Sequence, residues 1–173
     1  GTSALPFRQI RAGVAVAGAG DTVLVADGTY LGFDVVSKIG TAGAPITLRA
    51  PGRAADVTVT TDRSDNRDSI RVSFSSYIVL DGLRGSGANR AAVRIDQSGH
   101  VTIRNGTFGN NATWGIFTDF SDDLLIENNE CFGSGTQHGI YVSNSGDRPV
   151  LRGNRVHDNH GGGIQLNADA SQG

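Results

Sequence analysis

Five side chains that could bind or transform a ligand recur at nearly constant spacing. They are Arg71, Arg94, Phe117, Tyr141 and Gln165, and consecutive members are 23 or 24 residues apart. Aromatic rings offer flat apolar faces on which sugar rings stack, and arginine forms paired hydrogen bonds with carboxylates. If the spacing corresponds to a structural repeat, these side chains form one row, and the row favours a surface for acidic sugars.

Two carboxylates belong to the same spacing. Asp96 and Asp119 each stand two residues after a member of the row and are 23 residues apart. Neighbouring carboxylates repel when both are ionised, so such a pair either binds a cation such as Ca²⁺ or shares a proton. The alternative is a structural role, because aspartate at the end of a strand commonly accepts hydrogen bonds from the local backbone.

Trp114 and His138 complete the candidate set, since each stands three residues before a member of the row. The functional interpretation gives His138 and Tyr141 acid–base roles and makes Trp114 a sugar-stacking residue. Structural alternatives remain open. An exposed corner accounts for His138, and ring stacking along a ladder of strands accounts for Phe117 and Tyr141.

Apolar residues show which elements would position this set. One series of apolar residues has a period of 23 or 24 residues: Val23, Ile46, Ile70, Val93, Ile116, Ile140 and Ile164. The residue two positions after each of them is also apolar in six of the seven cases. This alternation is typical of half-buried strands. Two further strands per repeat are indicated by Leu80, Ile103, Ile126 and Leu151, and by Phe108, Cys131 and Val156. The sequence therefore predicts an all-β fold, a single-stranded parallel β-helix of about six to seven coils.

The ends of the chain differ from the repeats. Residues 1–20 contain apolar residues at helical spacing, with a proline before them and glycines after, which predicts a helix that caps the solenoid. Residues 21–173 are predicted to form the β-helix. The chain stops inside a seventh repeat with no second cap, so we expect the C-terminal end to be covered by further coils or by another chain.

Composition limits the classes of partner. The net charge of −2 gives no basic field for nucleic acid, and no run of 18 apolar residues could span a membrane. The single cysteine, Cys131, cannot form an internal disulfide, and its place in an apolar series predicts a core residue.

Several segments resemble those of secreted right-handed β-helix proteins. "PFRQIRAGVAVAGAGDTVLVADGTYLG" resembles a capping helix followed by a first coil, and "GTAGAPITLRA" resembles the entry to the second coil in pectate-lyase-like proteins, including the family 9 lyases. The later "GI...N...I.NN" coils resemble the repeats of carbohydrate-binding and sugar-hydrolysing domains. The resemblance implies a right-handed solenoid in a secreted or periplasmic protein that handles polysaccharide.

The leading hypothesis from this resemblance is a lyase that acts on uronate-containing glycans by β-elimination. A cation or an arginine would neutralise the uronate carboxylate, and Arg94, Tyr141 or His138 would supply the base or the acid. Arg71, Phe117, Trp114 and Gln165 would bind substrate, and Asp96 with Asp119 would hold Ca²⁺. The alternatives are a non-catalytic carbohydrate-binding or adhesion module, and an inactive piece of a larger β-helix protein.

The family 9 lyases combine a lysine base with an aspartate-rich calcium site in the middle coils. Here the only lysine, Lys38, lies in an early coil, far along the chain from Asp96 and Asp119. The chain therefore departs from the family 9 pattern at the position of its base.

Overall fold

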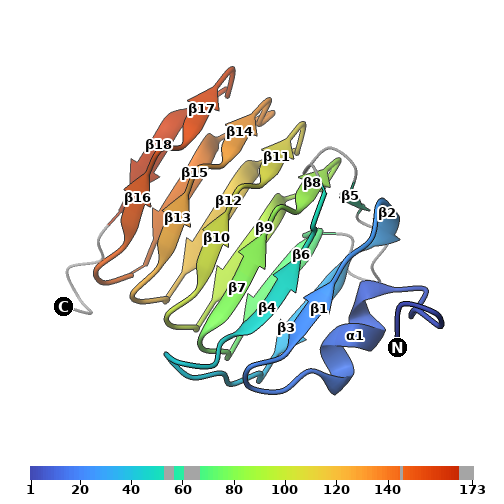
Figure 1. The fold of residues 1–173 in the computed structure, drawn as a ribbon. Helices are drawn as coiled ribbons and strands as arrows, with labels where there is room; N and C mark the ends of the chain where they lie inside the picture. The colour runs from blue at the N-terminus through green and yellow to red at the C-terminus, as the bar shows by residue number, and fades with distance from the viewer. Residues whose placement is uncertain (53–56, 61–66, 145, 168–173) are drawn as a thin grey trace.

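The chain winds into a three-sided solenoid, seen in a computed structural model that describes residues 1–52, 57–60, 67–144 and 146–167. Successive coils stack from the N-terminal helix to the last strands, as the colour order of Figure 1 shows. Every strand pairs in parallel with its equivalents in the neighbouring coils, so residues about two dozen positions apart become neighbours. The predicted all-β parallel β-helix is confirmed.

Each side of the solenoid is a six-stranded parallel sheet. Sheet A contains β1 (Thr22–Leu24), β4 (Ile46–Arg49), β7 (Ile78–Asp81), β10 (Thr102–Arg104), β13 (Leu125–Glu127) and β16 (Val150–Arg152). Sheet B contains β2 (Gly28–Leu31), β5 (Val57–Thr60), β8 (Arg84–Ser86), β11 (Thr107–Gly109), β14 (Glu130–Phe132) and β17 (Arg155–His157). Sheet C contains β3 (Phe33–Val36), β6 (Ile70–Ser73), β9 (Ala91–Asp96), β12 (Trp114–Asp119), β15 (His138–Ser143) and β18 (Gly162–Leu166).

The core consists of inward-facing rows, one from each sheet. In sheet C, Ile70, Val93, Ile116 and Ile140 are adjacent in register and fully buried. Cys131 belongs to the corresponding row of sheet B and is buried, as predicted. Burial in apolar surroundings raises the pKa of the Cys131 thiol, which therefore stays protonated and unreactive. These rows fix which side chains face outward, because successive residues of a strand alternate between core and solvent.

The predicted register is wrong for the first two repeats. Val23 pairs with Leu48 in sheet A, and the partner of Ile70 in sheet C is Phe33. Because the second coil is longer, register partners on β3 and β6, such as Asp34 and Arg71, are 37 residues apart in the sequence. All three sheets show the same apolar alternation. The even spacing of Val23, Ile46 and Ile70 therefore grouped residues that lie in different sheets. The outward neighbour of Arg71 is consequently Asp34.

A short helix covers the N-terminal end. The helix α1 (Ile10–Val16) is shorter than the predicted segment 1–20, and it places Ile10, Val14 and the following Ala17 in the core. Lys38 Nζ donates hydrogen bonds of 2.9 Å to the carbonyl oxygens of Ala15 and Ala17. A cation at the C-terminal end of a helix also interacts favourably with the helix dipole. The only lysine is therefore bound to the cap.

The last coil exposes residues that are buried in the coil before it. Ile164 and Leu166 are 45% and 56% exposed, whereas their register partners Ile140 and Val142 are buried. Within the described part of the chain, no strand pairs with the far edges of β16, β17 and β18. Among the described residues, these two side chains therefore lack the neighbouring coil that buries Ile140 and Val142.

Candidate functional site

The candidate residues come together on the outer face of sheet C. Arg94, Phe117, Tyr141 and Gln165 are consecutive register partners on β9, β12, β15 and β18. Their side chains point outward because the alternating residues of the same strands fill the core. The sequence-based row is thus a real spatial row from β6 onward, and the acid–base roles of its members stay predictions.

Aromatic rings form a continuous cluster on this face. The Trp114 ring stacks on Phe117 with centroids 4.3 Å apart, and Tyr141 lies 5.7 Å from Phe117 and 5.9 Å from Trp114. The His138 ring lies 5.8 Å from Tyr141 in a tilted arrangement. Phe117 is only 8% exposed. It therefore supports its neighbours, and the accessible aromatic surface belongs to Trp114 and Tyr141.

Two polar atoms of this cluster differ in their hydrogen bonding. The Tyr141 hydroxyl accepts a long hydrogen bond of 3.4 Å from Asn167 Nδ2. The Trp114 Nε1–H is buried and finds no acceptor among the described residues. A buried indole N–H normally has a partner, so this donor is available to a ligand or a water molecule that reaches it.

The predicted metal pair is bridged by an arginine of the same face. Asp96 and Asp119 are register partners, and Arg94 Nη2 lies 3.6 Å from Asp96 Oδ1 and 3.2 Å from Asp119 Oδ2. The Arg94 guanidinium also lies 5.6 Å from the centroid of the Phe117 ring. Asn144 Nδ2 donates to the other oxygen of Asp119 at 2.5 Å. One guanidinium thus bridges both carboxylates and offsets one of their two negative charges.

This arrangement does not fit a calcium ion. Ca²⁺ takes six to eight oxygen ligands, whereas here a cationic side chain already occupies the space between the two carboxylates. In the described part of the chain, no group of three or more His, Cys, Asp or Glu residues is placed to hold a metal ion. Arg94 thus lies where the predicted calcium ion would bind.

Replacing Arg94 tests whether its guanidinium takes the place of a metal ion between Asp96 and Asp119. In Arg94→Gln the two carboxylates repel, and we expect a loss of about 1–3 kcal/mol in unfolding free energy, since both are only partly exposed. We also expect Ca²⁺ to raise the melting temperature of Arg94→Gln and to leave that of the wild type unchanged. Calorimetry with calcium and with chelator measures both, and Arg84→Gln, on sheet B, is the control. Calcium stabilisation of the wild type would contradict the assignment.

The remaining candidates lie at the two ends of the row. Arg71 donates to Asp34 through Nε at 3.0 Å and Nη2 at 3.3 Å, so its fork is already bound to a carboxylate. Gln165 is exposed in the last coil, where its amide donates to the carbonyl oxygen of Leu166 at 3.2 Å. Gln165 remains accessible to a ligand. Arg71 could bind a ligand only by breaking its ion pair with Asp34.

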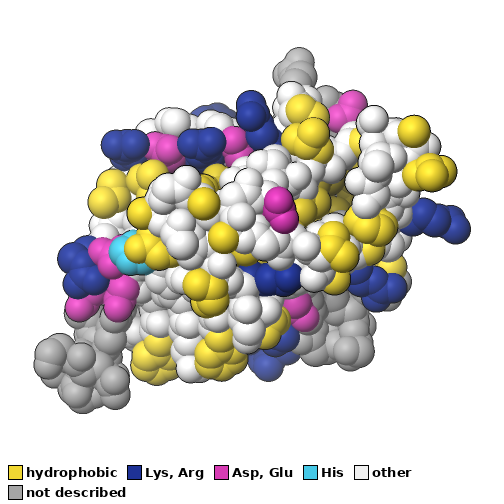
Figure 2. Space-filling model, turned by 60° about the horizontal axis from the view of Figure 1, so that its bottom comes forward, with side chains coloured by type: hydrophobic (Ala, Val, Ile, Leu, Met, Phe, Trp, Pro, Cys, Tyr) yellow, Lys and Arg dark blue, Asp and Glu magenta, His cyan; other side chains and the backbone are white. Residues whose placement is uncertain are grey.

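Outside this face, charged side chains are mostly paired across coils. Figure 2 shows basic and acidic side chains side by side along the surface, without a large patch of one sign. Asp81 lies between Arg49 and Arg104, and Arg152 pairs with Glu127. Such exposed pairs contribute little stability each, and among the described residues outside sheet C their opposite charges largely offset one another.

A histidine in the last coil is held by two carboxylates. His157 Nδ1 lies 2.7 Å from Asp158 Oδ2, and Nε2 lies 3.2 Å from Glu130 Oε1. The hydrogen bonds to Asp158 and Glu130 raise the pKa of His157 above its ordinary value. The charged imidazole therefore stabilises the folded state below the ordinary histidine pKa of about 6.5, and this contribution is lost as pH rises through the raised pKa.

This linkage predicts a pH-dependent difference between the wild type and His157→Gln. The melting temperature of the wild type should exceed that of the variant most at about pH 5.5 and least at about pH 9, since the unfolded histidine titrates near 6.5. His160→Gln, in the same turn, serves as the matched control. A difference that does not change with pH would contradict the assignment.

Comparison with known proteins places the chain among solenoids. A family model described as "Right handed beta helix region" matches residues 52–172. A search of curated proteins finds no match. No helix among the described residues is long and apolar enough to cross a membrane.

Solved structures with the same fold include three lyases. An alginate lyase from Paenibacillus sp. str. FPU-7 is 23% identical with a TM-score of 0.72, and covers 91% of this chain and 55% of its own. The pectate lyase Pel9A is 20% identical with a TM-score of 0.72, and covers 90% of this chain and 44% of its own. A rhamnogalacturonan lyase is 18% identical with a TM-score of 0.52, and the match covers 97% of this chain and 59% of the lyase chain. The chain thus spans about half the length of these structures.

Proposed function

The chain belongs to the family of right-handed β-helix regions, and from that premise we propose that it binds a uronate-containing polysaccharide on the outer face of sheet C and cleaves it by β-elimination. The alginate, pectate and rhamnogalacturonan lyases that share the fold support this class of substrate. We further propose that the protein works outside the cytoplasm, in the secreted or periplasmic space where such polymers are found.

The observation that carries the proposal is the grouping of two proton-exchanging side chains with an aromatic platform and an arginine. The His138 and Tyr141 rings are 5.8 Å apart, and Trp114 lies beside them. Arg94 lies over Phe117, which stacks on Trp114 and on Tyr141. Within the described residues, the face thus combines sugar stacking, a positive charge and two acid–base groups.

Each residue has a distinct part in the proposed reaction. Arg94 places positive charge near the uronate carboxylate, which makes the proton on the adjacent ring carbon more acidic. His138, as the neutral imidazole, removes that proton, and the Tyr141 hydroxyl donates a proton to the departing glycosidic oxygen. The bond between that oxygen and the ring breaks, and a carbon–carbon double bond forms in the sugar. Trp114 supports the sugar ring by stacking.

A non-catalytic carbohydrate-binding module is the second candidate. It is favoured by the ion pairs of Arg71 with Asp34 and of Arg94 with Asp119, because arginines already bound to carboxylates neutralise a substrate less effectively. Such a module would keep the aromatic surface of Trp114 and Tyr141 and would bind without turnover. The same face would then serve recognition alone.

An assay of unsaturated products separates the two candidates. The protein is incubated with polygalacturonate, with alginate and with rhamnogalacturonan, and the ultraviolet absorbance of the new double bond is followed. We expect absorbance to rise with at least one polymer. If the protein migrates more slowly in gels that contain these polymers but the absorbance does not change, the result would favour the binding module over the lyase. If the protein shows no turnover and no retardation with any of these polymers, both candidate functions are rejected.

A further inference from the structure

A second exposed aromatic feature lies at the corner where the chain leaves sheet C. Phe74, Gln97 and Phe120 directly follow the last residues of β6, β9 and β12, and their φ angles are 50°, 46° and 46°. This left-handed region is unfavourable for bulky side chains. In the next coil the same corner is occupied by Asn144, at φ 47°, a residue type that tolerates it well. The phenylalanines are therefore not required by the backbone.

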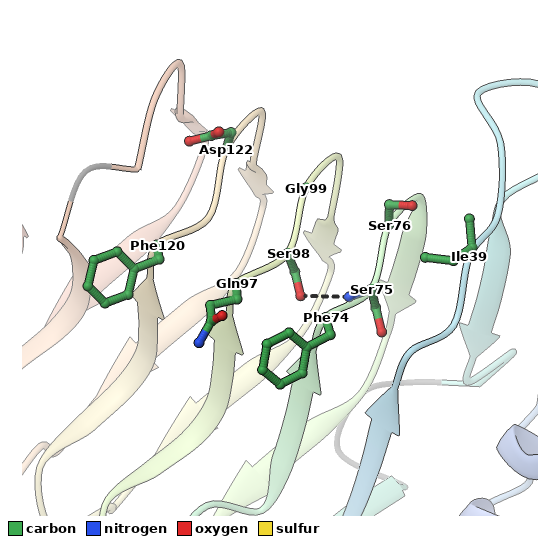
Figure 3. A pocket seen from close by; sticks show the side chains of 9 residues that line it. All are labelled: Ile39, Phe74, Ser75, Ser76, Gln97, Ser98, Gly99, Phe120 and Asp122. Atoms are coloured by element: carbon green, nitrogen blue, oxygen red, sulfur yellow. Dashed lines mark hydrogen bonds between the residues drawn. The ribbon is translucent and has the colours of Figure 1, made fainter. Parts of the chain in front are cut away.

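Neither phenylalanine serves the core. Phe74 is 53% exposed and Phe120 is 46% exposed. Figure 3 shows both rings projecting from the corner on the same side, with the Gln97 amide between them. Together with Ile39, Ser76 and Asp122 they line a shallow groove, here named the corner groove. A strained backbone that displays apolar rings to solvent is more typical of a binding surface than of a structural turn.

The spacing of the rings suits an extended chain of sugars. Phe74 and Phe120 are two coils apart, which corresponds to roughly 10 Å at the usual spacing of strands. This separation is comparable to the length of a disaccharide in an extended polysaccharide. Gln97, in the coil between them, can both donate and accept hydrogen bonds, as sugar hydroxyls require. No hydrogen bond from its amide is found within the described residues.

The charge of the corner groove differs from that of the outer face of sheet C. Its lining contains one carboxylate, Asp122, and no lysine or arginine. Asp122 Oδ1 accepts a hydrogen bond of 2.8 Å from the Asp147 backbone N–H, which keeps the carboxylate in place. A uronate would be repelled there, whereas Asp122 can accept hydrogen bonds from neutral hydroxyl groups. The complementary occupant is a neutral sugar.

We propose that the corner groove binds neutral sugar rings, with Phe74 and Phe120 as stacking platforms. This inference rests on the proposed function, because the groove adjoins the sheet C face: Phe120 follows Asp119, the ion-pair partner of Arg94. The uronates of the polymer substrate contact Arg94, Trp114 and Tyr141 on that face. The neutral rings in the groove belong either to side branches of that polymer or to a separate glycan.

The test compares the wild type with the double variant Phe74→Asn/Phe120→Asn. The probes are galactan, arabinan and xylan oligosaccharides, unbranched polygalacturonate, and rhamnogalacturonan with and without neutral branches. We expect binding of at least one neutral oligosaccharide to weaken about tenfold or more in the double variant by titration calorimetry. The melting temperature should stay the same or rise, because asparagine tolerates the left-handed backbone. Leu24→Ala, which removes an exposed apolar side chain from sheet A, is the control.

The probes separate the two sources of the neutral sugar. Tighter binding of branched than unbranched rhamnogalacturonan, lost in the double variant, assigns the groove to side branches. Equal binding of both, with neutral oligosaccharides still affected by the double variant, assigns it to a separate glycan.

Three outcomes would overturn the proposal. These are no neutral probe bound by the wild type, equal binding of neutral probes by wild type and double variant, and a concentration-dependent self-association that the variant abolishes without any glycan effect. The last outcome would make the corner groove a protein contact. Release of unsaturated product from polygalacturonate reports on sheet C alone, so failure of β-elimination is recognised separately.

Discussion

Gly115→Ala should lower the unfolding free energy by about 3 kcal/mol, which corresponds to a fall of roughly 6–12 °C in melting temperature. An added Cβ would lie 2.6 Å from the carbonyl oxygen of Gly139, 3.1 Å from that of Phe108 and 3.2 Å from Cys131 Cβ. Two of these contacts are with backbone, which cannot move without displacing whole coils. The large effect follows because each coil is held rigidly by its neighbours.

Gly43→Ala is the matched control for this prediction. A Cβ at Gly43 has nothing within 4 Å, and the backbone there is outside the left-handed region. The substitution should be neutral or stabilising by about 0.5 kcal/mol, through the lower entropy of the unfolded chain. Thermal and urea denaturation of the two variants measure the contrast. Equal stability of Gly115→Ala and Gly43→Ala would contradict the close stacking of coils around Gly115 in β12.

Tyr141→Phe and His138→Gln should each reduce the rate of unsaturated product formation by about 10²–10⁴-fold, as expected for removal of a positioned acid or base. Tyr141→Phe keeps the aromatic ring, so polymer binding and melting temperature should change little. The effect would therefore appear in kcat more than in KM. A loss of binding with unchanged kcat would assign Tyr141 to recognition alone.

The chain supplies a matched pair of controls for these variants. Tyr77 and His100 occupy another corner, where their rings stack with centroids 4.4 Å apart, and His100 Nε2 lies 3.7 Å from Asp123. Tyr77→Phe and His100→Gln change the same residue types away from the sheet C face. They should leave product formation within about twofold of the wild type. Equal losses in both pairs would indicate a structural origin.

The sequence predicted the fold from the spacing of its apolar residues. From Ile70 onward each coil has 23 to 25 residues, so the equal intervals identified true neighbours such as Phe117 and Tyr141. Before Ile70 the intervals were equally regular and misleading. Val23 and Ile46 belong to sheet A, because the long second coil breaks the numerical period while all three sheets keep the same alternation. Period alone does not identify the sheet.

The sequence predicted which residues of the candidate site are spatial neighbours, but it did not predict their interactions. The row of Arg94, Phe117 and Tyr141 followed from spacing, but the sequence did not show that Arg94 bridges Asp96 and Asp119. It also did not show that Phe117 is covered by its neighbours. These features depend on rotamers and on lateral contacts, which a one-dimensional repeat does not specify.

The corner groove was missed although a signal was present. Phe74 and Phe120 directly follow outward-facing strand ends, at positions where the repeat otherwise uses turn residues such as Asn144. A bulky apolar residue at a corner that favours asparagine or glycine is the signal that could have identified it. The apolar periodicity drew attention to inward rows and away from this corner.

Trp114 provides the most direct test of the central claim, that the outer face of sheet C is the surface that meets uronate polysaccharide. It is the only tryptophan in the chain and lies within the aromatic cluster. Titration of the wild type with uronate oligosaccharides should produce a saturable change in tryptophan fluorescence that Tyr141→Ala abolishes. Binding detected by calorimetry with no change in the fluorescence of Trp114 would place the ligand elsewhere and contradict the account.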